Sequence, residues 1–247
     1  MKQLVAFDLD GTLATSKQAI DPEMAVLLAR LTQTVAVAVM SGGDWPQFAA
    51  QLVGKLATGS DLAKLFLLPT SGTKLYRFES EWRLIYAEAL SVTERATISE
   101  ALNAVIATLN LASAPSWGER IEDRGTQITF SALGQQAPPG AKQAWDPDMA
   151  KRLQIQALIA PMLPEFAVRI GGSTSIDITR QGIDKGYGIT RLSQVAGISL
   201  ADMMFVGDAL FPGGNDHAVI DAGVATIGVR DVEETKRIIE AIVLCRT

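Results

Sequence analysis

The feature of this sequence that most constrains its fold is an apolar run near the N-terminus that ends in two aspartates. Residues 5–9 have the composition of a buried strand, yet Asp8 lies near the end of the run and Asp10 follows it. Burying carboxylates is costly unless cations or hydrogen-bond donors compensate for the lost water. The run therefore predicts a strand whose carboxyl end lies at a polar site.

Strand-like apolar runs alternate with helical patterns at both ends of the chain. The strands are predicted at residues 5–9, 35–40, 65–68, 203–206 and 225–229, and the helices at 21–31, 45–56, 185–195 and 231–244. Strand–helix–strand order favours parallel pairing through right-handed crossovers. We therefore predict an α/β fold with a Rossmann-like, doubly wound parallel sheet as its core.

The middle of the chain has a different pattern. Residues 127–131 and 175–179 alternate strictly between apolar and polar side chains. Helices are predicted from a capping box at Ser91 and from Asp146-Pro147. These signals favour an antiparallel sheet with helices on one face and an open polar face. The predicted domains are a core of residues 1–81 and 182–247 and an α+β domain inserted at 82–181.

Composition argues against several classes of function. The chain has 247 residues and a formal net charge of −5, and an isoelectric point near 5.0. These values argue against nucleic-acid binding, which depends on basic surfaces. No stretch of about 18 consecutive apolar residues occurs, so no membrane span is expected. Cys245 is the only cysteine, which excludes an internal disulfide and favours the cytosol.

Polar residues follow three of the predicted parallel strands. Asp8, Asp208 and the Ser41-Gly42 pair all lie at strand ends, where an open parallel sheet binds its ligands. Clustered carboxylates are tolerated if a cation lies among them, and hard oxygen ligands suit Mg²⁺ together with a substrate phosphate. Lys185 and Thr12 could hold oxygens of the same phosphate.

These residues carry a resemblance to a known family. Residues 8–12 (Asp-Leu-Asp-Gly-Thr), Ser41, Lys185 and the segment 207–216 resemble the four motifs of the haloacid dehalogenase (HAD) superfamily. The insertion resembles the type IIB cap of that superfamily. Within the type, the chain is most similar to the eukaryotic-type phosphomannomutases and related sugar phosphatases. Segments 171–177 and 211–217, Asp184-Lys185 and Arg124-Gly125-Thr126 carry this closer resemblance.

The resemblance implies a mechanism. Asp8 would be the nucleophile that forms an aspartyl phosphate, and Asp10 would be the general acid and base. Lys185 would stabilise the charge of the transferring group. The implied phosphate ligands are Thr12, Ser41, Gly42 and Lys185, and the implied Mg²⁺ ligands are Asp8, Asp10 through its carbonyl, Asp208, Asn215 and Asp216.

The inserted domain would choose the substrate, a small sugar phosphate. The candidate substrate ligands are Lys17, Arg124, Lys142, Ser175 and Asp177, each of which could instead have an ordinary structural role. The phosphomannomutases clamp a second phosphate with arginines of the cap. This sequence has Ser131 and Lys142 where two of those arginines are expected, and lysine replaces a bidentate guanidinium poorly.

Two functions remain open within the resemblance. The incomplete clamp and the Ser41 hydroxyl favour a Mg²⁺-dependent sugar phosphatase. The alternative is a phosphomannomutase-like interconversion of hexose 1- and 6-phosphates. A non-catalytic sugar-phosphate binder is less favoured because it would need no nucleophile. The resemblance also implies a possible homodimer that forms through the inserted domain.

Overall fold

The computed structural model describes residues 1–15, 17–113 and 115–246. The chain divides into two compact units, which we call the core unit (Met1–Ala87 with Asp184–Thr247) and the inserted unit (Glu88–Ile183). The observed boundaries therefore differ from the predicted limits of 82 and 181. The first boundary was placed six residues too early, because Trp82–Ala87 pairs with its neighbour in the core sheet.

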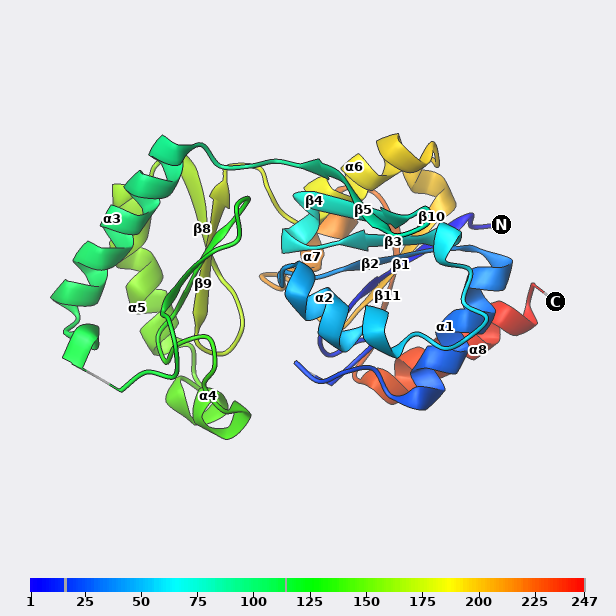
Figure 1. The fold of residues 1–247 in the computed structure, drawn as a ribbon, viewed down its shortest axis with the longest axis horizontal. Coiled ribbons are helices and arrows are strands. Elements are labelled where there is room, and N and C mark those ends of the chain that lie inside the picture. The colour runs from blue at the N-terminus through cyan, green and yellow to red at the C-terminus, as the bar shows by residue number, and fades with distance from the viewer. Residues whose placement is uncertain (16, 114, 247) are drawn as a thin grey trace. The chain divides into compact units, whose positions relative to one another are not determined.

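The core unit is built on a seven-stranded sheet in the order β11-β10-β1-β2-β3-β4-β5 (Figure 1). Its strands are β1 (Leu4–Asp8), β2 (Ala36–Met40), β3 (Leu65–Leu68), β4 (Lys74–Phe78), β5 (Trp82–Ala87), β10 (Met203–Gly207) and β11 (Ala225–Gly228). The strands from β11 to β3 are parallel, and β4 and β5 add an antiparallel hairpin. The predicted doubly wound α/β fold is confirmed, and β1 is the middle strand of the five parallel ones.

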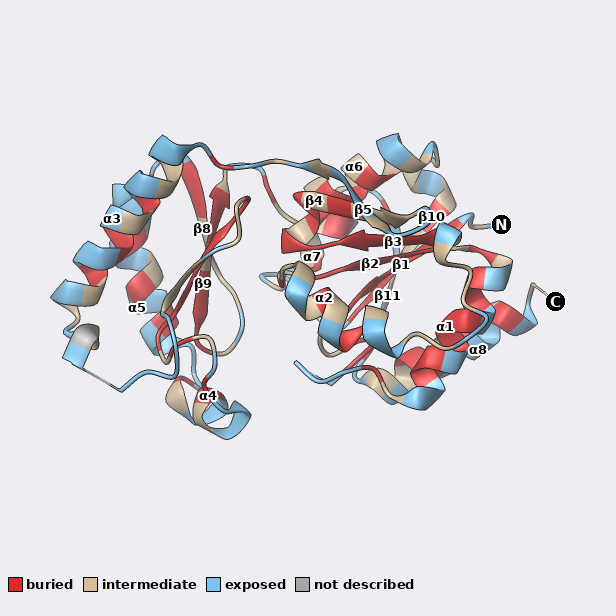
Figure 2. Cartoon of the chain, viewed as in Figure 1, coloured by how far each residue is buried: buried red, intermediate tan, exposed pale blue. Residues whose placement is uncertain are grey.

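Helices cover both faces of this sheet. They are α1 (Pro22–Thr34), α2 (Trp45–Gln51), α6 (Lys185–Ala196), α7 (His217–Asp221) and α8 (Val232–Leu244). Successive side chains of a strand point to opposite faces. In β1, Val5 and Phe7 accordingly join the cluster under α1, α2 and α8, whereas Leu4 and Ala6 join the cluster under α6 and α7. Figure 2 shows the buried strands between these layers.

Aspartates begin three of these helices, as the sequence predicts for α1 and α8. The side chains of Asp21, Asp184 and Asp231 accept hydrogen bonds from backbone N–H groups in the first turns of α1, α6 and α8, at 2.8–2.9 Å. Each bond satisfies a helix N–H that would otherwise lack a partner. The helix predicted over 45–56 is shorter, because α2 ends at Gln51 and a separate 3₁₀ turn follows at Val53–Lys55.

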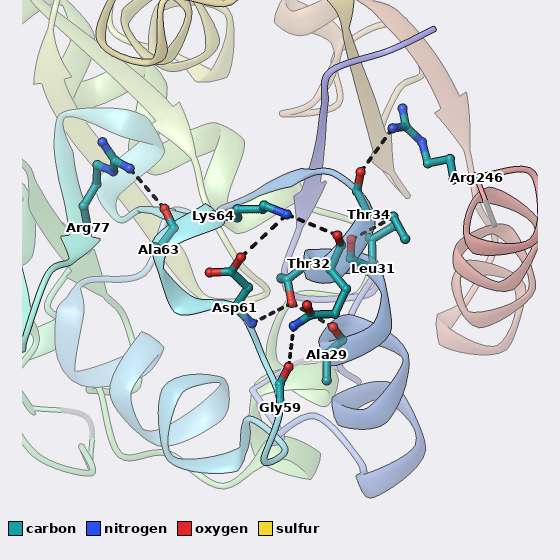
Figure 3. A network of polar contacts seen from close by, with 11 residues as sticks. Ala29, Leu31, Thr32, Thr34, Gly59, Asp61, Ala63, Lys64, Arg77 and Arg246 are labelled. Carbon is teal, nitrogen blue, oxygen red and sulfur yellow. Dashed lines mark hydrogen bonds and ion pairs between the residues drawn. The ribbon is translucent and has the colours of Figure 1, made fainter.

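The segment between α2 and β3 is fastened to α1 by polar contacts (Figure 3). The Thr32 hydroxyl accepts from the backbone N–H of Asp61 at 3.0 Å. The Gln33 amide donates to the Gly59 carbonyl at 2.7 Å, and Lys64 Nζ donates to the Gln33 carbonyl at 3.1 Å. These contacts fix the course of a segment that has little regular structure.

The inserted unit contains a four-stranded antiparallel sheet in the order β6-β7-β9-β8. Its elements are α3 (Val92–Thr108), β6 (Ile121–Asp123), β7 (Ile128–Ser131), α4 (Pro139–Trp145), α5 (Ala150–Ile159), β8 (Phe166–Ile170) and β9 (Ser175–Arg180). Phe130 and Ile176 lie in a buried cluster with Leu102 of α3 and Ile155 of α5. The predicted alternation of β7 and β9 therefore places helices on one face, as expected.

The opposite, polar face of this sheet is not open. Gln127, Thr129, Ser131 and Thr179 are each less than 5% exposed. The Thr129 hydroxyl donates to Asp177 Oδ1 at 2.7 Å and accepts from the Gln127 amide at 2.9 Å. The prediction of an open polar face is wrong for these residues. Alternation along a strand shows which side chains are polar, but it does not show whether they are buried and hydrogen-bonded to one another.

The start of α5 also differs from the prediction. Asp146 does not open the helix, which begins at Ala150. Its carboxylate instead accepts from the backbone N–H groups of Lys151 and Arg152 at 2.9 and 3.0 Å, and from Arg152 Nε at 2.7 Å. Arg152 also donates to the Gly172 carbonyl. A buried ion pair thus joins the start of α5 to the turn before β9.

The described residues contain no helix that is long and apolar enough to cross a membrane.

The ion pair between Glu94 and Arg180 predicts a pH-dependent stability of the inserted unit. Hydrogen bonds from Arg180 and from the Ser91 backbone lower the pKa of Glu94 from 4.5 to about 2. Because the folded-state pKa is depressed, this contribution is complete above about pH 4.5 and disappears as the pH falls towards 2. We expect E94Q to destabilise the unit at pH 7, by about 1 kcal/mol at most for this partly exposed pair, and to match the wild type near pH 2.

The measurement is hydrogen exchange of the α3 amides in the full chain across this pH range. Glutamine preserves the capping box, so E94Q tests the ion pair alone. E100Q, an exposed change on the same helix, is the matched control. An equal loss of protection by E94Q at both ends of the pH range would contradict the assignment.

Candidate active site

Three carboxylates meet at the carboxyl edge of the parallel strands. Asp8 ends β1, Asp208 follows β10, and Asp216 precedes α7. One oxygen from each lies within 4.8 Å of the others. Asp8 and Asp216 are buried and Asp208 is exposed, so the cluster reaches solvent through Asp208.

The chain turns tightly beneath this cluster. Gly11 has a φ of +92°, and a Cβ built there would lie 2.4 Å from Asp208 Oδ2. Only glycine allows both this backbone conformation and this approach. The next residue, Thr12, is fully buried, and its hydroxyl donates to Asp208 Oδ1 at 3.5 Å. The loop after β1 is thereby held against the loop after β10.

Lys185 supplies the cation of the cluster. Its side chain is 1% exposed, and Nζ donates to Asp8 Oδ1 at 2.5 Å and also to Asp216 Oδ1. Its place at the first turn of α6 follows from the Asp184 cap. Burial alone would lower the pKa of Lys185, but the carboxylates of Asp8 and Asp216 raise it above its ordinary value. The lysine therefore remains charged.

Asp8 is in an unusual electrostatic setting. Burial raises the pKa of its carboxyl to about 7; the Lys185 ammonium opposes this rise, and Asp216 and Asp208 add to it. One ammonium group faces three carboxylates, which leaves an excess of negative charge. Hard oxygen donors with excess negative charge fit a divalent cation such as Mg²⁺. The predicted ligands Asp8, Asp208 and Asp216 thus meet, whereas the predicted ligand Asn215 is exposed.

The side chain of Asp10 is held away from this cluster by other donors. The Lys17 backbone N–H donates to Oδ1 at 2.6 Å, the Gln47 amide donates to Oδ2 at 2.7 Å, and the Gln51 amide reaches Oδ1 at 3.5 Å. Lys17 thus contacts the site through its backbone. Gln47 and Gln51 are not among the residues predicted from the sequence, although their i,i+4 spacing just after the Ser41 loop is a signal that indicates a shared helix face.

Ser41 and Gly42 form the loop after β2. Ser41 is 3% exposed, and its hydroxyl accepts from the Gly43 N–H at 3.1 Å. The Ser41 carbonyl accepts from the Ser71 N–H at 2.9 Å. β1 and β2 pair in register, with Asp8 opposite Met40. Ser41 therefore begins its loop beside the end of β1, as the strand order predicts.

The other predicted ligands belong to the inserted unit. Ser175 and Asp177 lie on β9 opposite Ser131 and Thr129, on its polar face. Arg124 pairs with Glu122 at 2.7 Å. Lys142 is 7% exposed, and its ammonium donates to the Gln135 carbonyl at 3.0 Å. Arg124 and Lys142 therefore each have a structural partner within the unit.

A shallow hollow of about 280 Å³ lies elsewhere on the core unit, between the 53–62 segment and Trp82. It contains none of the predicted site residues. Its walls are mostly small or aliphatic side chains.

Comparisons with known proteins place the chain in a family. A sequence model of the family described as eukaryotic phosphomannomutase matches residues 24–245. A probable phosphomannomutase of Caenorhabditis elegans is 25% identical, and the alignment covers 98% of this chain and 95% of the relative. Phosphomannomutase 1 of Homo sapiens is 27% identical over 91% of this chain and 85% of its own.

Solved structures share the fold. A Plasmodium falciparum IMP-nucleotidase superposes with a TM-score of 0.71 and 14% identity, covering 98% of this chain and 62% of its own. A trehalose-6-phosphate phosphatase related protein superposes with a TM-score of 0.58 and 16% identity, and the superposition covers 98% of this chain and 97% of that protein. These likenesses concern the fold alone. Since the family model spans most of the chain, the protein belongs to the eukaryotic phosphomannomutase family of the HAD superfamily and is an enzyme of the HAD phosphotransferase type.

Proposed function

We propose that this enzyme interconverts hexose 1- and 6-phosphates, as a phosphomannomutase does. The observation that carries the proposal is the buried Asp8–Lys185–Asp216 cluster in a chain whose family model extends over residues 24–245. Two relatives named as phosphomannomutases align with this chain over 95% and 93% of their own lengths. We also propose Mg²⁺ as the cation that Asp8, Asp208 and Asp216 bind.

The proposed chemistry begins at Asp8. Its oxygen attacks phosphorus in line, the Asp8–phosphorus bond forms, and the bond from phosphorus to the sugar oxygen breaks. A proton from Asp10 passes to the leaving sugar oxygen. When bound, Mg²⁺ would reduce the repulsion between the Asp8 carboxylate and the phosphate. Lys185 remains charged beside both groups and stabilises the negative charge that develops.

The second half of the reaction reverses these steps. Another sugar hydroxyl gives its proton to Asp10 and attacks the phosphorus of the aspartyl phosphate. The Asp8–phosphorus bond breaks, and Asp8 is again free. A mutase must therefore bind a bisphosphorylated sugar in both orientations, which requires a second phosphate site.

A second candidate function is hydrolysis, in which water replaces the second sugar hydroxyl. One observation favours it. In the inserted unit, Arg124 pairs with Glu122 and Lys142 binds the Gln135 carbonyl, and Ser131 stands where an arginine is expected. If this unit holds a second phosphate poorly, water can take the phosphoryl group.

One preparation assayed in two ways separates the two functions. We expect conversion of mannose 1-phosphate to mannose 6-phosphate that requires a hexose 1,6-bisphosphate primer. D8N should lower the rate at least about a thousandfold, because the nucleophile is lost. Steady phosphate release without isomerisation would instead identify a phosphatase, and absence of both reactions in the wild type would contradict the proposal.

Mg²⁺ binding should depend on pH through Asp8. Below pH 7 its carboxyl, with a pKa of about 7, binds a proton that must leave before the metal binds. Calorimetric titration should therefore show the Mg²⁺ affinity falling about tenfold per pH unit below 7 and levelling off above it. D208N should weaken binding at every pH. D221N, which removes an exposed charge outside the cluster, should leave it unchanged, and equal losses in both variants would contradict the assigned ligands.

A further inference from the structure

We propose that Gln47 and Gln51 are positioning residues that fix the Asp10 carboxylate for proton transfer. The inference rests on the proposed role of Asp10 as general acid and base. Gln47 Nε2 donates both to Asp10 Oδ2 and to Gln51 Oε1, each at 2.7 Å. Gln51 Nε2 lies 3.5 Å from Asp10 Oδ1. The two amides thus join both oxygens of Asp10 to one face of α2.

The pair stands on a firmly anchored helix. Asp44, just before α2, pairs with Lys74 of β4 at 2.7 Å. Trp45 stacks on Tyr76 of β4, with ring centroids 4.1 Å apart, and Phe48 is fully buried. Groups locked by such packing hold a catalytic side chain more closely than groups on a loop. The position of Asp10 is therefore coupled to the sheet through α2.

A glycine in the loop before α2 leaves space for the side chain of Gln47. A Cβ built on Gly43 would lie 1.8 Å from Gln47 Oε1 and 2.4 Å from its Cδ. Glycine thus makes room for the Gln47 amide to lie across the loop. Because the clash involves the end of a flexible side chain, alanine at this position would displace the amide without disrupting the fold.

The chemistry explains why neutral donors suit this place. Proton transfer needs the Asp10 oxygen within hydrogen-bond reach of the leaving oxygen, and an error of about 1 Å can cost about a hundredfold in rate. A lysine or arginine could also orient Asp10 but would add a charge beside it. The amides of Gln47 and Gln51 orient the carboxylate without changing the charge of the site.

The test compares two leaving groups. A sugar alkoxide leaves slowly without a proton, whereas p-nitrophenolate needs none. We expect Q47M to lower turnover of mannose 1-phosphate about a hundredfold, while the initial burst of p-nitrophenolate from p-nitrophenyl phosphate, which reports phosphorylation of Asp8, changes less than about threefold. G43A should show the same selective loss, although it retains both glutamines.

Q33M is the matched control, because Gln33 lies on α1 and donates to Gly59. It should leave both rates unchanged. Equal losses with the two substrates in Q47M, or no loss with either, would overturn the positioning role.

A second measurement does not require turnover. In the NMR spectrum of the full-length protein, D10A should shift the side-chain amide signals of Gln47 and leave those of Gln33 in place. Unshifted Gln47 signals would overturn the inference whatever the activity. A wild type inactive towards both substrates, with the Gln47 signals shifted, would contradict the proposed function while supporting the contact.

Discussion

The site depends on one buried interaction, the Lys185 ammonium between the carboxylates of Asp8 and Asp216. Without this cation, two buried carboxylates would repel each other in a medium that screens charge poorly. The contact requires the end of β1 and the starts of α6 and α7 to converge. Even so, the cluster has more carboxylates than the one ammonium can balance, and Asp208 adds to this excess of negative charge. The excess suits the cluster to a divalent cation.

The strand order explains this convergence. β1 lies between β2 and β10, so the loops after all three strands emerge at the same edge. The loop after β1 carries Asp10, and the loop after β2 carries Ser41 and leads into α2. The loop after β10 carries Asp208 and Asp216. Because α2 follows directly from β2, its glutamines also reach this edge. A doubly wound sheet thereby brings carboxylates, an ammonium group and amide donors together from distant parts of the chain.

The inserted unit uses its charges differently. Arg152 is buried against Asp146, Arg180 binds Glu94, and Arg124 binds Glu122. These ion pairs fasten helices and strands within the unit. In each pair, the positive charge of the arginine already faces a carboxylate. In the proposed reactions, the choice between a sugar hydroxyl and water as phosphoryl acceptor would therefore depend on the composition of this unit, whereas the proposed chemistry at Asp8 is common to both.

Sequence patterns alone predicted the parallel core strands and the helices α1, α2, α6 and α8, because periodicity and helix caps are visible in short segments. They also predicted, through the motifs of the family resemblance, the Asp8–Lys185–Asp208–Asp216 set. Only the tertiary structure revealed that β5 belongs to the core sheet, that Asp146 binds N–H groups in the first turn of a helix beginning at Ala150, and that polar residues of β7 and β9 are buried. It likewise revealed the glutamines on Asp10. Each of these depends on a partner distant in sequence or in another element, and the residue patterns of a single segment carry no record of such a partner.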